Sequence, residues 1–210
     1  MNLFAVIPVK PFAEGKSRLK DILSDAARCD LNFRMFGHVL DVATAVLGPA
    51  NTIIVSADQT ALEAARDRGS LAVREEPRAG LNAALQIGAE TVAAQGADAV
   101  LILPTDLPTM SGGDIEALTS HANPSPFVII APDRRDQGTN ALLLSPPDAI
   151  GFSFGLNSLA AHQEAARACH IEPVRVLRDG LALDIDTPED YQQLVDRQLK
   201  GGENGKFMGE

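Results

Sequence analysis

Short apolar runs alternate along the chain with segments whose apolar residues recur every three or four positions, and this alternation constrains the fold more than any other feature. The runs suit buried strands, whereas the intervening segments suit amphipathic helices, as at Leu31, Met35 and Val39. Strands that alternate with helices form βα units around a mainly parallel sheet. We therefore predict a single-domain α/β fold over residues 1–200, with a Rossmann-like sheet and helices on both faces.

The predicted elements follow this rhythm through the whole domain. Strands are expected at residues 3–9, 52–56, 71–73, 99–103, 127–131 and 141–144, and helices at residues 25–47, 59–68, 81–94, 113–120, 158–168 and from 188 onward. Two strand-like runs precede the last helix. The final residues, 201–210, are rich in glycine and polar side chains, which predicts a flexible C-terminal tail.

The composition narrows the classes of partner and compartment. A formal net charge of −10 disfavours a broad nucleic-acid or anionic-membrane surface, because such binding needs a basic footprint. No apolar stretch approaches the roughly 18 residues of a membrane span, and the N-terminus lacks the pattern of a secretory signal. Cys29 and Cys169 are far apart and outside any metal-binding spacing, which suits a reducing compartment. We expect a cytoplasmic protein that binds neither nucleic acid nor membrane.

A basic loop follows the first predicted strand. Ligands of open α/β sheets bind beyond the carboxyl ends of the strands, so such loops are candidate sites. Lys10, Lys16 and Arg18 could neutralise a triphosphate while backbone N–H groups wrap around it. The loop is not a P-loop, since that motif requires glycine where Lys10 stands. A solvated basic turn is the alternative.

Two further loops could meet a nucleotide. Gly80 and Asn82 lie at a predicted helix start, where free N–H groups and a side-chain amide can contact phosphate or base, although Asn82 also suits a simple cap. Asp106 follows the fourth long strand between two prolines, and a magnesium ion on a nucleotide takes one or two such carboxylates. A turn-forming role is the alternative for Asp106.

A second acidic motif precedes the last helix. If residues 181–186 are extended, Asp184 and Asp186 point to the same face and can both approach one metal ion. Residues 187–190 read as a helix start with an N-cap, a first-turn proline and a capping acid, so we assign them to structure.

Residues 136–140 and 154–158 combine glycine with hydroxyl and amide donors. Ser158 lies at the start of a predicted helix, where backbone N–H groups favour anions. With Thr139 and Gly155 it could hold a phosphate or carboxylate, although each segment alone also suits a turn or a cap. The four histidines, at positions 38, 121, 162 and 170, form no close cluster and are interpreted as non-catalytic.

Taken together, these motifs resemble the phospholactate guanylyltransferase family over about residues 3 to 195. The segments PVKPFAEGKSRL, GLNAAL, LPTDLP, APDRRDQGTNALLL, FSFGLNSLAAH and LDIDTPED occur in the family's order and spacing. The resemblance implies the nucleotidyltransferase fold shared by molybdenum-cofactor guanylyltransferases and nucleotide-diphospho-sugar transferases. It also implies transfer of GMP from GTP to 2-phospho-L-lactate, phosphoenolpyruvate or 3-phosphoglycerate, with release of pyrophosphate, in the synthesis of the deazaflavin coenzyme F-420.

The resemblance also implies roles for individual residues. Nucleotide-binding roles fall on Lys10, Lys16, Arg18, Gly80 and Asn82, acceptor-binding roles on Thr139, Gly155 and Ser158, and Mg²⁺-binding roles on Asp106, Asp184 and Asp186, with Lys16 and Asp106 as the catalytic pair.

Residues 136–137 and 156–157 depart from the family's pattern in the acceptor loops, so the identity of the acid stays open. The alternatives are a molybdenum-cofactor or sugar-phosphate nucleotidyltransferase and a nucleotide-binding module without turnover. A homodimer is an open possibility for the assembly.

Overall fold

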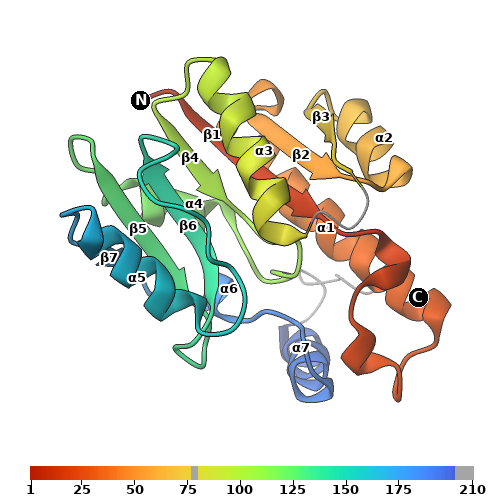
Figure 1. Cartoon of the computed structure of the whole chain (residues 1–210). Helices are drawn as coiled ribbons and strands as arrows, with labels where there is room; N and C mark the ends of the chain where they lie inside the picture. Colours follow the sequence, from red (N-terminus) through yellow and green to blue (C-terminus); the bar gives the residue numbers. More distant parts are fainter. Residues whose placement is uncertain (77–79, 202–210) are drawn as a thin grey trace.

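The computed structural model describes residues 1–76 and 80–201, and within these residues seven strands form one mixed sheet in the order β3-β2-β1-β4-β6-β5-β7 (Figure 1). The strands are β1 Leu3–Val9, β2 Thr52–Ser56, β3 Leu71–Arg74, β4 Ala99–Ile102, β5 Phe127–Pro132, β6 Thr139–Ser145 and β7 Val174–Arg175. Every neighbouring pair is parallel except the two that involve β6, which runs antiparallel to both β4 and β5. The prediction of a mainly parallel sheet is confirmed.

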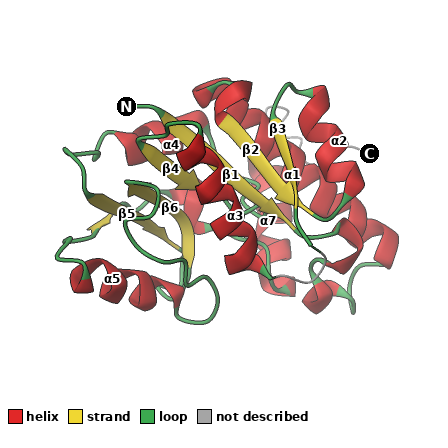
Figure 2. Cartoon of the chain, turned by 45° about the horizontal axis from the view of Figure 1, so that its top comes forward, coloured by secondary structure: helices red, strands yellow, loops and turns green. Residues whose placement is uncertain are grey.

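Helices cover both faces of this sheet, as Figure 2 shows. One face packs against α1, α2, α4 and α6, and the other packs against α3 and α5. The helices are α1 Asp25–Leu47, α2 Gln59–Asp67, α3 Leu81–Ala94, α4 Gly112–Thr119, α5 Ser158–Ala168, α6 Asp179–Ala182 and α7 Pro188–Gly201, with short 3₁₀ helices at Phe12–Glu14, Ser17–Leu19 and Pro49–Asn51. In the described part of the chain, no helix combines the length and the apolar character needed to cross a membrane.

The central strand β1 shows why the fold needs two covered faces. All seven of its residues are buried, and alternate side chains enter opposite cores. Ala5, Ile7 and Val9 contact the core on the α1 side, whereas Phe4 and Val6 contact the core on the α3 side. A strand buried on both faces has a continuous apolar sequence, and residues 3–9 have such a sequence.

The segment before α7 departs from the predicted strand. Residues 179–182 form the short helix α6, and the chain then runs irregularly to α7 without joining the sheet. The alternation of side chains nevertheless holds, because Leu181, Leu183 and Ile185 are buried. Leu183 and Ile185 pack with Leu19 of the second 3₁₀ helix and with side chains of α1 and α7 in a small third core. This packing holds the segment in place without strand pairing.

The predicted tail 201–210 lies outside the described residues except for Gly201, which ends α7.

Candidate active site

The basic loop after β1 is a packed structure and not a solvated turn. Phe12 is buried against aromatic rings of α1, and its backbone N–H donates to the Asp58 carboxylate at 3.0 Å. The Asn32 amide of α1 donates to the Phe12 carbonyl at 2.7 Å. A Cβ on Gly15 would lie 2.4 Å from the same amide, so any other residue would displace the Asn32 side chain from its present position. These contacts fix the direction of the next residue, Lys16.

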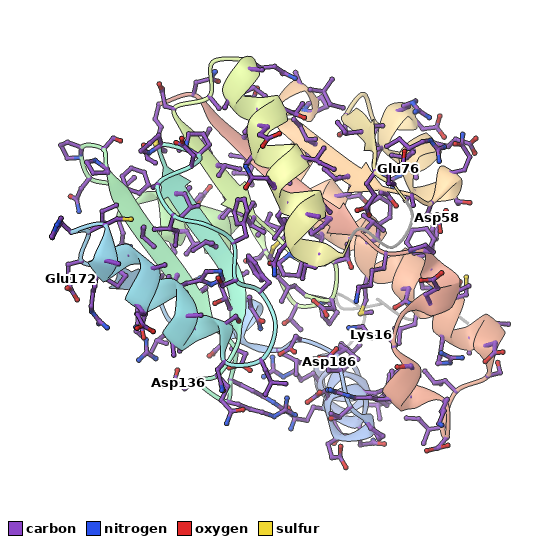
Figure 3. All side chains as sticks on the ribbon, viewed as in Figure 1. Lys16, Asp58, Glu76, Asp136, Glu172 and Asp186 are labelled. Atoms are coloured by element: carbon purple, nitrogen blue, oxygen red, sulfur yellow. The ribbon has the colours of Figure 1, made fainter. Side chains whose placement is uncertain are left out.

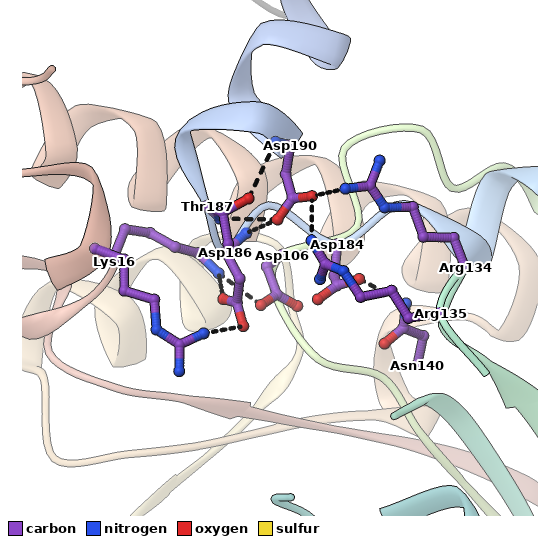
Figure 4. A network of polar contacts seen from close by, with 10 residues as sticks. Lys16, Asp106, Arg134, Arg135, Asn140, Asp184, Asp186, Thr187 and Asp190 are labelled. Atoms are coloured by element: carbon purple, nitrogen blue, oxygen red, sulfur yellow. Dashed lines mark hydrogen bonds and ion pairs between the residues drawn. The ribbon is translucent and has the colours of Figure 1, made fainter. Parts of the chain in front are cut away.

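Lys16 is the cation at the centre of the site. Its ammonium lies 2.6 Å from Asp106 and 3.0 Å from Asp186, and its side chain is only 10% exposed (Figures 3 and 4). Burial on its own lowers the pKa of Lys16, but the two carboxylates outweigh it, so the pKa is raised. Lys16 has a left-handed backbone conformation with φ of 55°, which is unusual for a residue other than glycine. The loop therefore holds a charged lysine between two acids from distant parts of the chain.

Asp184 is the third carboxylate of the cluster, and it makes different contacts. The Asn140 amide of β6 donates to it at 3.3 Å and to the Leu181 carbonyl at 2.8 Å. Burial raises the pKa of Asp184, and the charges of Asp106 and Asp186 raise it further. Asp184 and Asp186 thus share the less buried side of their segment, as predicted, but Lys16 pairs with Asp186 and Asn140 with Asp184.

Two adjoining cavities form a cleft along this edge of the sheet. The larger, of about 590 Å³, is lined among others by Lys10, Glu75 and Gly80. The second, of about 420 Å³, is lined by residues of the basic loop together with Asp106 and Asp186. Both cavities contact the β1 loop and Leu81 at the start of α3. A volume of this size suits a nucleotide-sized ligand.

The predicted nucleotide-binding residues border this cleft in different ways. Lys10 lines both cavities, and Arg18, 69% exposed, lies 3.9 Å from Asp186. Gly80 caps α3 with φ of 90° and lines the larger cavity. Asn82 instead exchanges hydrogen bonds with the Phe154 backbone, accepting at 2.9 Å and donating at 3.2 Å. Its amide therefore ties α3 to the loop before α5.

The predicted acceptor residues lie at the start of β6 and of α5. The Thr139 N–H donates to the Ser158 hydroxyl at 2.9 Å, and the Thr139 hydroxyl lies 3.0 Å from the ring of His162. Thr139 and Ser158 are almost completely buried. Gly155 is exposed with φ of 136°, and a Cβ there would meet nothing within 4 Å.

The model of the family described as "Guanylyl transferase CofC like" matches residues 3–204, which is nearly the whole chain. The chain belongs to this family. It is 42% identical to a phosphoenolpyruvate guanylyltransferase of Sphaerobacter thermophilus, with 93% of each chain covered. It is also 33% identical to a 3-phospho-D-glycerate guanylyltransferase of Colwellia psychrerythraea, with 93% of this chain and 92% of the relative covered.

Solved structures place the guanylyl transferase fold in a wider group. A putative nucleotide-diphospho-sugar transferase from Desulfovibrio desulfuricans superposes with a TM-score of 0.69 at 15% identity, covering 98% of this chain and 90% of its own. A cytidylyltransferase from Leptospira borgpetersenii gives a TM-score of 0.61 at 13% identity, covering 92% and 85%. The predicted nucleotidyltransferase fold is therefore confirmed.

Sequence reasoning about this CofC-like chain missed a buried arginine–aspartate network (Figure 4). Asp190 is fully buried and accepts hydrogen bonds from Arg134 and Arg135 of the β5–β6 loop. It also accepts the backbone N–H groups of Asp186 and Thr187, at 3.1 and 2.8 Å. Although burial opposes its charge, the bonds from Thr187, the Asp186 backbone and Arg134 lower the pKa of Asp190. The predicted helix cap is present, and the same carboxylate also fastens the aspartate segment to the β5–β6 loop.

Glu75 was missed as well. It directly follows β3, lines the larger cavity, and has its pKa raised by burial. An acid directly after a predicted strand was the available signal.

The donor set fits a divalent cation that arrives with a nucleotide. Across residues 1–76 and 80–201, no three His, Cys, Asp or Glu side chains form a ready-made metal site. Asp106 and Asp186 share the Lys16 ammonium, and Asp184 is close enough for their charges to raise its pKa, so the three carboxylates leave an excess of negative charge. Hard divalent cations on nucleotides take one or two carboxylates and complete their shell with phosphate and water oxygens. The three aspartates can supply that share.

Proposed function

We propose that this chain transfers GMP from GTP to a small phosphorylated three-carbon acid and releases pyrophosphate, in the synthesis of coenzyme F-420. The names of the relatives favour phosphoenolpyruvate or 3-phospho-D-glycerate as the acid, and 2-phospho-L-lactate is a further candidate. We assign the reaction to the cytoplasm, where the free cysteines Cys29 and Cys169 stay reduced.

One observation carries this proposal. In a member of a guanylyl transferase family, Lys16 and two aspartates meet at the end of a nucleotide-sized cleft. A nucleotide that occupies the larger cavity with its base directs its phosphates toward this cluster, past Lys10 and Arg18. Glu75, which lines the larger cavity, can accept the two adjacent N–H groups on the pairing edge of guanine, a pair of donors that adenine lacks.

The reaction needs no nucleophile from the protein. A phosphate oxygen of the acid attacks the α-phosphorus of GTP, the bond from this phosphorus to the β-phosphate oxygen breaks, and pyrophosphate leaves. The protein has to align the two reactants and offset the charge on the approaching and departing oxygens. Lys10, Lys16 and Arg18 are placed to stabilise the departing pyrophosphate. Mg²⁺, held by Asp106, Asp184 and Asp186, would supply further charge neutralisation at the phosphates.

The test is pyrophosphate release from GTP and Mg²⁺ with each of the three acids supplied separately. We expect release with one acid, loss of release with a chelator, and loss of release in Asp106→Asn, which should remain folded. Release only with molybdopterin or a sugar phosphate would identify the alternative nucleotidyltransferase. GTP binding without release under any acceptor would identify a module without turnover. Sedimentation with and without GTP would show whether the chain acts as a homodimer.

A further inference from the structure

A buried hydrogen-bond chain runs from the loop before α5 to the first residue of β6. The Ser153 N–H donates to Nε2 of His162 at 3.0 Å, and Nδ1 of the same ring lies 3.0 Å from Oγ1 of Thr139. The Thr139 N–H in turn donates to Oγ of Ser158 at 2.9 Å. His162 is 0% exposed, Thr139 4% and Ser158 2%. The histidine thus stands directly behind the two predicted acceptor-binding hydroxyls.

The direction of each bond in this chain is determined by chemistry. A backbone N–H can only donate, so Nε2 of His162 must be the accepting, unprotonated nitrogen. Burial lowers the pKa of His162 to about 4, so the ring is neutral near pH 7 and its one hydrogen resides on Nδ1. Nδ1 therefore donates to Oγ1 of Thr139, which acts as the acceptor in this pair.

Both hydroxyl hydrogens are left to donate elsewhere. Thr139 Oγ1 accepts from His162, and Ser158 Oγ accepts from the Thr139 backbone. Across residues 1–76 and 80–201, neither hydroxyl makes a further hydrogen bond. Each of the two oxygens already accepts from a fixed N–H donor, so its own O–H hydrogen remains available to a further acceptor. An anionic oxygen is the acceptor that such a pair suits best.

We propose that His162 is a positioning residue that sets the Thr139 hydroxyl as a donor to the anionic phosphate or carboxylate of the acceptor acid. This inference rests on the proposed function. The ring is itself held, because Phe154 packs edge-on against it at 4.8 Å between centroids. The Phe154 backbone is bonded to Asn82 at the start of α3, on the nucleotide side of the cleft. The acceptor hydroxyls are therefore oriented by a segment anchored to the nucleotide-binding helix.

The kinetic test compares His162→Phe, which removes both ring nitrogens, with His162→Asn, whose amide can still donate to Thr139. We expect His162→Phe to raise the KM for the acid about tenfold with little change in the KM for GTP, and His162→Asn to recover part of the loss. In a Thr139→Val background, His162→Phe should change the KM for the acid less than about twofold. Equal changes in both KM values, or additive effects of the two substitutions, would overturn the proposal.

Controls separate this proposal from the proposed function. His121→Asn, at an exposed position after α4, serves as the matched histidine substitution and should leave both KM values unchanged. Nitrogen NMR of the wild-type ring should show Nδ1 protonated and Nε2 bare, and the opposite tautomer would overturn the proposal whatever the activity. If no acid supports turnover, the proposed function fails. The role of His162 is then tested by titrating the wild type and His162→Phe with inorganic phosphate and with pyruvate. Weaker binding of either anion by His162→Phe than by the wild type supports the role, and equal binding of both anions by the two proteins refutes it.

Discussion

Replacing Lys16 by Met tests the central charge arrangement of the site. Met keeps the length and bulk of the lysine stem, so the substitution removes the charge and little packing. The Lys16 ammonium forms ion pairs of 2.6 and 3.0 Å with Asp106 and Asp186. Without it, Asp106 loses its counter-ion and Asp186 keeps only the exposed Arg18 at 3.9 Å, while Asp184 remains beside them. We expect a less stable protein whose stability responds more strongly to divalent cations.

The magnitude follows from the exposure of the partners. Removing one partner of a buried ion pair costs about 3–5 kcal/mol, because the remaining charge is uncompensated. The lysine is 10% exposed, but its two partners are 23% and 44% exposed, so water screens the charges that remain. We therefore expect the free energy of unfolding to fall by about 2 kcal/mol at pH 7 without divalent ions.

Urea unfolding at pH 7, with and without Mg²⁺, measures this change. Because Mg²⁺ would take over the missing positive charge, it should stabilise Lys16→Met more than the wild type. Lys20→Met is the matched control, since Lys20 is exposed one turn further along the same segment. If Lys16→Met and Lys20→Met unfold at the same urea concentration, the ammonium does not compensate the aspartates and the charge argument fails.

Three further predictions follow from single residues. Asp184→Asn should stabilise the ligand-free protein at pH 7. The pKa of Asp184 is higher in the folded than in the unfolded chain, so the wild-type protein loses stability as the pH rises from the unfolded pKa through the folded pKa. The higher melting temperature of Asp184→Asn should therefore disappear in acid, below both pKa values. Gly88→Ala should lower the free energy of unfolding by about 1–3 kcal/mol in urea denaturation, because its Cβ would lie 2.4 Å from Val6. Glu75→Gln should reduce the preference for GTP over ATP by about tenfold in kcat/KM, and an unchanged ratio would remove Glu75 from base recognition.

The fold was predictable because its information is local. Apolar runs and helical periodicity depend on neighbours within a few residues, and every long predicted strand and helix is present. The prediction of a strand-like run was wrong at residues 181–186. Alternating apolar side chains suit a strand, but they suit equally well an irregular segment that packs on the small third core. Leu183 and Ile185 pack with Leu19 and its neighbours, and that choice depends on α1 and α7, which the local pattern does not contain.

The candidate site was predictable only in part, because its contacts join distant loops. The carboxylates and cations stood out as charged residues beyond strand ends, where ligands of open α/β sheets bind. Asp190 did not, since its sequence context describes a helix cap fully. Its ion-pair partners, Arg134 and Arg135, come from the β5–β6 loop, which is distant in the sequence. His162 was read as non-catalytic because it lies inside a helix, and its partners Ser153 and Thr139 are identified only by the structure.

The direction of β6 explains how both halves of the site come to one edge of the sheet. Because β6 runs antiparallel to β4, with Ile102 opposite Leu142, its first residues lie beyond the carboxyl end of β4, where the loop with Asp106 begins. A parallel strand would have placed them at the opposite edge. Successive strand residues point to opposite faces. Thr139 accordingly reaches His162 of α5 on one face, and Asn140 reaches Asp184 and the α6 backbone on the other. Under the proposed function, the reacting phosphates would meet across the start of β6, between the hydroxyl pair and the carboxylates, and a change in this strand's register would separate the two groups.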